Sequence, residues 1–247
     1  MFSGWGLLPV YSYAGRVDCC NFMDSTVWEG SLKEGEPFGY GKRQNLGRQY
    51  IREATDLHGI PSEGYDFLCS SHMIEHAANS LKALFEWKRV LKEGGAMLLV
   101  VPHKEGTFDH RRPVTTLDHL VEDFSRDIGE DDLTHMEEII ELHDLKRDPG
   151  AGDFENFKRR ARDNYANRCL HHHVFDTDLV VRMVDYVGLK ICAVEPSLPH
   201  NIIVVCNKVS RGQDADNSIF LDGRADYRSR SPFLSDKKCL NLAEKYD

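Results

Sequence analysis

Short apolar segments alternate with segments of helical periodicity along most of the chain. Residues 16–22, 49–53 and 65–70 are predicted strands, and residues 96–101 form a nearly continuous apolar run that ends at Pro102. Such a continuous run is typical of a strand covered on both faces, as in a parallel sheet.

Helical spacing of apolar residues separates these strands. Residues 77–91 predict one helix, and Gly94-Gly95 is expected to end it, because glycine accepts the left-handed conformation of a C-cap. A second helix is predicted over residues 176–187. The alternation of strands and helices predicts an α/β fold with a Rossmann-like, mostly parallel sheet. Two last strands are expected to close it as an antiparallel hairpin: 189–195 and 201–208.

Two further regions differ from this pattern. Residues 103–175 are polar and rich in histidine, with an amphipathic helix over 134–145. This block is too long for a simple connection, so it predicts a helical cap inserted into a domain of residues 1–209. The composition of residues 210–247 shifts to Ser, Asp, Arg and Gly, which predicts a disordered tail with a short helix near 240–246.

Composition and charge narrow the function classes. The 247 residues carry a formal net charge of −9, which argues against a protein that binds duplex nucleic acid through a basic face. No apolar run approaches the roughly 20 residues that span a bilayer. The N-terminus has no basic region before its apolar residues, so no signal peptide is predicted and a cytoplasmic location is expected. The seven cysteines show no C-x-x-C pair and are expected to be reduced.

The stretch Gly64–Pro102 carries several linked motifs. A strand with Asp66 is followed by Ser70-Ser71, by Glu75-His76, and by a helix that ends in R-V-L-K-E-G-G over residues 89–95. This order and spacing resemble class I S-adenosylmethionine-dependent methyltransferases of the type 11 branch. The resemblance implies S-adenosylmethionine as cofactor and a methyl acceptor as partner.

The resemblance also implies cofactor-binding positions at the carboxyl ends of the strands, where ligands of open α/β sheets bind. Asn21 takes the slot of an acidic residue that holds ribose hydroxyls, and Glu53 takes the acidic slot near adenine. Only fifteen residues precede Arg16, and Gly4 and Gly6 are all that resembles the family's Gly-rich loop. The N-terminal strand and this loop are therefore expected to be shortened or missing. The implied cofactor residues are Asn21, Asp24, Glu53, Ala54, Ser70, Ser71 and His72.

His72, Glu75 and His76 are spaced i, i+3 and i+4, which places them on one face of a helix. Some relatives with a similar spacing bind a divalent metal here, completed by a later histidine. One of the three histidines from His171 to His173 would be that ligand, and His172 is taken as the candidate. The alternative is that Glu75-His76 only caps and orients the loop. The same letters match the H-x-x-E-H pattern of zinc peptidases, which gives a minor alternative function.

Candidate catalytic residues follow the strand that ends at Pro102. Asp109 or His110 could act as general base toward a hydroxyl or amine acceptor, and Arg112 could clamp an anionic substrate. The alternative is a polar loop whose charges pair with one another.

The sequence thus predicts methyl transfer to a small-molecule or sugar-like acceptor, with oxygen favoured as the accepting atom. The alternative is a non-catalytic methyltransferase-like protein that uses the cap as an interaction surface. Cofactor binding discriminates the two, because only an active enzyme needs it.

Overall fold

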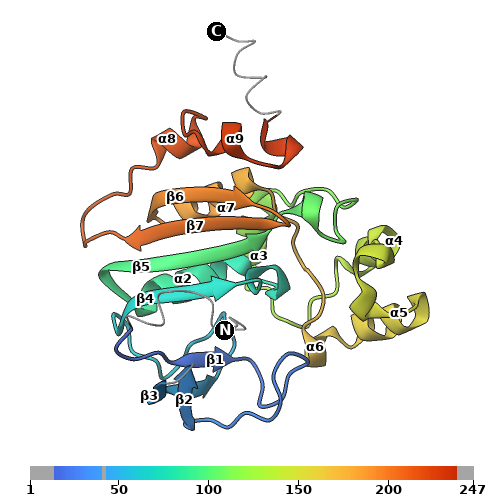
Figure 1. The fold of residues 1–247 in the computed structure, drawn as a ribbon, viewed down its shortest axis with the longest axis horizontal. Helices are drawn as coiled ribbons and strands as arrows, with labels where there is room; N and C mark the ends of the chain where they lie inside the picture. The colour runs from blue at the N-terminus through green and yellow to red at the C-terminus, as the bar shows by residue number, and fades with distance from the viewer. Residues whose placement is uncertain (1–13, 41–42, 238–247) are drawn as a thin grey trace.

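The computed structural model describes residues 14–40 and 43–237, and these form two β-sheets with helices around them (Figure 1). The sheet orders are β1-β3-β2 and β4-β5-β7-β6. The strands are β1 (Cys19–Asn21), β2 (Pro37–Tyr40), β3 (Arg43–Ile51), β4 (Tyr65–Ser71), β5 (Leu91–Pro102), β6 (Leu189–Ser197) and β7 (Asn201–Lys208).

The predicted α/β, Rossmann-like class is confirmed. Strands β1 and β3 pair in parallel, as do β4 and β5, while β2–β3, β5–β7 and β6–β7 are antiparallel. The expected closing hairpin is β6–β7, whose register runs from Leu189 opposite Lys208 to Ser197 opposite Asn201. Parallel β4 and β5 end at the same edge of their sheet, and this edge carries the candidate site.

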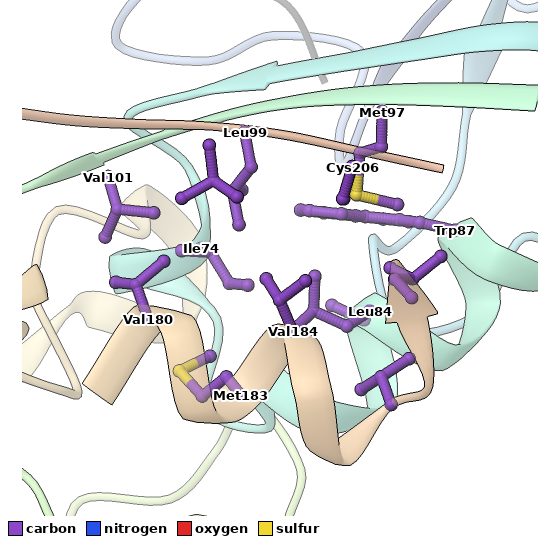
Figure 2. Packing of buried hydrophobic residues seen from close by; sticks show 14 of the residues in the cluster. Ile74, Leu84, Trp87, Met97, Leu99, Val101, Val180, Met183, Val184 and Cys206 are labelled. Carbon is purple, nitrogen blue, oxygen red and sulfur yellow. The ribbon is translucent and has the colours of Figure 1, made fainter. Parts of the chain in front are cut away.

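Three helices cover one face of the larger sheet: α2 (Ser80–Val90), α3 (Leu117–Ser125) and α7 (Thr177–Tyr186). The apolar positions of α2 and α7 meet one face of β5 and β7, so the alternating side chains of those strands are fully buried there (Figure 2). Burying such a side chain stabilises the fold by about 1.5–3 kcal/mol. The residues that meet in this layer include Ile74, Leu84, Trp87, Met97, Leu99, Val101, Val180, Met183, Val184 and Cys206.

The prediction that Gly94-Gly95 ends the helix is wrong. The helix ends at Val90, and Leu91 already pairs with Tyr65 as the first residue of β5. The glycines lie inside β5, where the register with β4 shifts and Gly94 takes φ of 75°. Glycine is needed there because an L side chain rarely adopts this conformation.

Residues 103–175, for which a helical cap is predicted, begin and end at a parallel bridge between His103 and Phe175. Helix α3 of this block belongs to the helical layer on the larger sheet. The later residues of the block form a separate small core around Phe157. The helix predicted over residues 134–145 is shorter in the structure. The cap elements after α3 are α4 (Met136–Leu142), α5 (Phe154–Arg162), α6 (Asn164–Asn167) and the 3-10 turns at Leu145–Arg147 and Pro149–Ala151.

The prediction of a disordered tail is wrong for its described part. Short helices α8 (Ser218–Leu221) and α9 (Tyr227–Arg230) lie beside β6 and α7. Phe233 is buried and its ring stacks on His103 at 3.8 Å. Asp236 accepts hydrogen bonds from two hydroxyls, Thr177 at 2.7 Å and Ser231 at 2.6 Å. A few buried side chains thus hold the described part of this segment in place, although its average composition is polar. The helix predicted near 240–246 lies outside the described residues.

A groove of about 710 Å³ separates the two sheets. It is lined by the edges of β1 and β4 that have no strand partner in the described part of the chain, and by Trp87 and Val90 below them. The predicted shortening of the N-terminal strand and Gly-rich loop concerns residues outside the described ranges.

Among residues 14–40 and 43–237, no helix has both the length and the apolar character needed to cross a membrane.

Candidate active site

A second hollow, a cavity of about 290 Å³, lies at the carboxyl ends of three strands. Asn21 ends β1, His72 directly follows β4, and Pro102 ends β5. This is the edge at which ligands of open α/β sheets bind. The cap closes the cavity from the other side, and the side chains that carry chemistry around it are His72, Glu75, His76, Arg168, His171 and His200.

The backbone at His72 positions the first of these groups. Its φ of 49° is unusual for a residue other than glycine, and its N–H donates to the Val100 carbonyl at 2.9 Å. Its Nε2 lies 2.9 Å from Asn201 Oδ1, so the ring is directed across to β7. Glu75 and His76 follow on a single 3-10 turn, Ile74–His76.

This geometry contradicts the zinc-peptidase alternative. A peptidase H-x-x-E-H motif needs both histidines on one face of a continuous helix, where they share a metal. Here His72 lies outside the helical turn and bonds Asn201, whereas His76 Nδ1 donates to the Leu170 carbonyl at 3.0 Å.

The three consecutive histidines of the cap, residues 171–173, lie beside the 3-10 turn and beside the residues that lead into α2. His172 N–H donates to the Glu75 carbonyl at 2.8 Å, and His173 Nε2 donates to the Ala78 carbonyl at 3.0 Å. These bonds hold the segment in place, and its histidine side chains have different partners. His171 lines the cavity, and His172 instead accepts from Asn164 Nδ2 at 3.1 Å inside the cap.

Asp109 and His171 form a buried dyad at the cavity. Asp109 Oδ2 lies 2.5 Å from His171 Nδ1, and Oδ1 accepts from Arg112 at 3.0 Å. Burial raises the pKa of Asp109, but His171 and Arg112 outweigh this and hold the pKa below its ordinary value. The carboxylate is therefore ionised and orients the imidazole, which leaves Nε2 of His171 as the nitrogen available to a bound acceptor.

Neither His110 nor Arg112 lies where its predicted role would require it. His110 is outside the cavity lining and pairs with Asp144 at 2.9 Å. Arg112 is only 1% exposed and binds protein groups with its guanidinium, so it has no open face for a substrate anion. Asp109 is the predicted catalytic residue that the structure places next to the cavity.

Glu75, His76 and His171 each offer one ligand atom, and these atoms lie within 4.8 Å of one another. His72 Nδ1 is 3.7 Å from Glu75 Oε1, but His172, the expected fourth ligand, is bonded inside the cap. Burial lowers the pKa of His76 to about 4, with a further contribution from the charge of His171. The pKa of Glu75 is raised by burial and lowered more strongly by its three histidine neighbours. A divalent metal at this edge stays a prediction.

The residues implied for the cofactor divide between the cavity and the groove. Asn21 and His72 line the cavity, while Ala54 and Ser70 line the groove. Consecutive residues of β1, Cys20 and Asn21, line one hollow each, so both hollows border the end of this strand. Asp24 is exposed and Ser71 faces neither hollow.

Two buried polar atoms at these strand ends have no hydrogen-bond partner in the described chain: Ser70 Oγ and Glu75 Oε2. Buried polar groups are nearly always paired, so such atoms indicate where a polar ligand can bind. The residues therefore fit a polar cofactor, although the acidic slot at Glu53 is engaged by the protein itself.

Arg168 is a site residue to which the sequence assigns no particular role. Its guanidinium lies 2.6 Å from Glu53 Oε1 and 5.3 Å from the Phe22 ring, and it lines the cavity. The same group lies 3.9 Å from Glu130, whose pKa burial raises to about 7 despite the opposing effect of Arg168. Arg168 thus ties the cap to the end of β3. Its separation of 115 residues from Glu53 gives no local signal in the sequence.

Comparison with known families supports the resemblance inferred from the sequence. Residues 36–99, about a quarter of the chain, match a family model described as a methyltransferase domain of type 11. This part of the chain is therefore similar to the methyltransferase domain of that family. No curated protein matches the chain.

Solved structures to which the chain is similar include a SAM-dependent methyltransferase from Methanosarcina mazei, at 12% identity and a TM-score of 0.39 over 70% of this chain and 73% of that one. A SAM-dependent methyltransferase from Aquifex aeolicus gives 13% and 0.37 over 66% and 56%. An O-methyltransferase family protein from Burkholderia thailandensis gives 12% and 0.36 over 68% and 37%. The chain thus spans between 37% and 73% of these proteins.

Proposed function

We propose that this chain catalyses S-adenosylmethionine-dependent methyl transfer to a small-molecule or sugar-like acceptor, at an oxygen atom. The observation that carries the proposal is the Asp109–His171 dyad in a cavity at the carboxyl ends of β1, β4 and β5. A family match alone names the reaction class, whereas the dyad supplies the proton acceptor that a hydroxyl nucleophile requires.

When bound, S-adenosylmethionine supplies a sulfonium-linked methyl group. Asn21, Ser70 and Glu75 are the residues that would hold it, because they are polar groups at the strand ends and two of them carry unpaired buried atoms. Glu75 also brings a negative charge that suits the cationic cofactor.

His171 would accept the proton of the acceptor hydroxyl on Nε2, and the hydroxyl oxygen would take the methyl group that bound S-adenosylmethionine would supply, with S-adenosylhomocysteine as the leaving group. Asp109 stabilises the imidazolium that forms, and Arg112 holds Asp109 in place. The ion pair between Arg168 and Glu53 holds the cap over the strand ends, and the cap thereby limits the access of water to this step.

The proposal is tested by S-adenosylhomocysteine release from labelled S-adenosylmethionine with a panel of sugars and small phenols, and with matched amines. We expect turnover with a hydroxyl compound. His171→Gln should lower kcat by about 100-fold or more while cofactor affinity is kept. His58→Gln, on the exposed surface beside Asp56, serves as the control.

His110→Gln separates the two candidate bases. A loss of turnover in this variant, with His171→Gln fully active, would overturn the assignment of His171. Turnover with amines only would overturn the choice of oxygen.

A further inference from the structure

A second histidine cluster lies where the cap meets the helical layer. His119 belongs to α3, His135 directly precedes α4, and His173 lies between α6 and α7. One ring nitrogen from each lies within 4.8 Å of the others, and Nε2 of His119 is 3.1 Å from Nε2 of His135. None of the three lines the cavity at the strand ends.

Asp123 adds a carboxylate to this cluster. It follows His119 by one helical turn, so both project from the same face of α3. Its Oδ2 lies 3.3 Å from His119 Nε2 and 3.6 Å from His173 Nε2. This oxygen is buried and has no hydrogen-bond partner among the described residues.

His173 has the hydrogen-bond pattern of a histidine prepared to bind a metal. The residue is 1% exposed, and its Nε2–H donates to the Ala78 carbonyl. The lone pair is therefore on Nδ1, which is buried and unpaired in the described part of the chain. Metal-binding histidines commonly donate their other ring N–H to a carbonyl in this way.

A hydrogen bond between His119 and His135 alone does not account for the cluster. One of the two rings can donate to the other, but this leaves the Asp123 oxygen and the His173 nitrogen buried and unsatisfied. A cation among the four side chains would satisfy both.

We propose that His119, His135, His173 and Asp123 form a binding site for a divalent transition-metal ion of the zinc type. Three imidazoles and one carboxylate are a donor set that Zn²⁺ takes in four-coordinate sites. His119 keeps 37% of its side chain exposed, which gives the ion a path from solvent. Four protein ligands leave no open position, so the site is structural.

The ion would join three segments that are far apart in the chain. It would link the sheet-covering helix α3 to the cap residue His135 and to the segment of consecutive histidines. Because His173 and His171 belong to one short segment bonded to Glu75 and Ala78, the ion would also hold that segment in register. The proposal stands on this cluster alone and does not depend on methyl transfer.

The test is Zn²⁺ binding to the full chain after chelator treatment, measured by competition with a chromogenic chelator. Co²⁺ absorption reports the geometry. We expect the unaltered chain to bind Zn²⁺, to show a tetrahedral Co²⁺ spectrum, and to unfold at higher temperature with Zn²⁺ than without it. His135→Gln should lose one bound equivalent and the thermal shift.

His119→Gln provides a second variant at a partly exposed position, in case the first does not fold. His76→Gln is the matched control, because it removes an imidazole from the other cluster, at the cavity. Retention of the equivalent in His76→Gln supports the proposal. Failure of the unaltered chain to bind Zn²⁺, or loss of the equivalent in His76→Gln with retention in His135→Gln, would overturn it.

Discussion

Arg112 offers a sharp test of how the cap is held together. Its guanidinium donates to Glu138 Oε1 at 2.8 Å and to Asp109 Oδ1 at 3.0 Å. It also donates to two backbone carbonyls, His171 at 2.8 Å and His172 at 3.1 Å. Arg112→Ala removes the cation and leaves a buried carboxylate and two carbonyls without this partner. Breaking a buried ion pair from one side costs about 3–5 kcal/mol, which sets the expected loss in free energy of unfolding.

The neighbouring Arg111 is the matched control. It is half exposed and lies 3.4 Å from Asp144 at the surface, so Arg111→Ala should change stability by no more than about 0.5 kcal/mol. The assay is urea unfolding followed by circular dichroism for both variants and for Arg112→Lys, which keeps the charge but not the planar fork. Equal losses for Arg111→Ala and Arg112→Ala would refute the argument that Arg112 organises the cap.

Two further predictions concern acid stability and thiol reactivity. Burial raises the pKa of Asp148, but the opposing effects of His143 and Arg160 are larger and lower it to about 2. The ionised carboxylate therefore stabilises the fold fully above the ordinary pKa of aspartate, and this stabilisation is lost as pH falls toward 2. Between pH 5 and 2 the unaltered chain should lose about 1–2 kcal/mol more stability than Asp148→Asn, after allowance for solvent screening, and parallel profiles would contradict this. Burial raises the pKa of Cys206 to about 12, so native Cys206 should resist a thiol reagent while exposed Cys192 reacts. The experiment compares Cys192→Ser with Cys206→Ala, and loss of a fast-reacting thiol in the second variant would refute it.

The strands and helices of the central layer could be predicted from the periodicity of apolar residues, because burial in each element follows its own local repeat. The strand over 96–101 alternates between a fully buried and a half-buried face, and the helix over 77–91 repeats every three to four residues. The helix end predicted at Gly94-Gly95 is wrong because a glycine with positive φ occurs in strand bulges as well as in helix caps. The local sequence shows the glycine but does not show which of these two structures it forms.

The tail and the site required tertiary information. Phe233 is one apolar residue in a polar segment, and only its stacking on His103 shows why the segment is ordered. Arg112 was expected to meet a substrate because it follows the end of a strand, but three of its four partners lie 26 to 60 positions away in the chain. The direction of each histidine in the cap depends on hydrogen bonds to Glu75 and Ala78, which spacing does not reveal.

The central claim is that the strand ends bind S-adenosylmethionine, and calorimetric titration with S-adenosylhomocysteine tests it most directly. We predict micromolar binding, about 8 kcal/mol, by the unaltered chain. Glu75→Gln should weaken binding to S-adenosylmethionine itself by about tenfold, through loss of a charged partner, while Asp127→Asn, at an exposed position outside both hollows, should not. A folded chain that shows no binding heat with either compound would contradict the account and favour a non-catalytic, methyltransferase-like interaction protein.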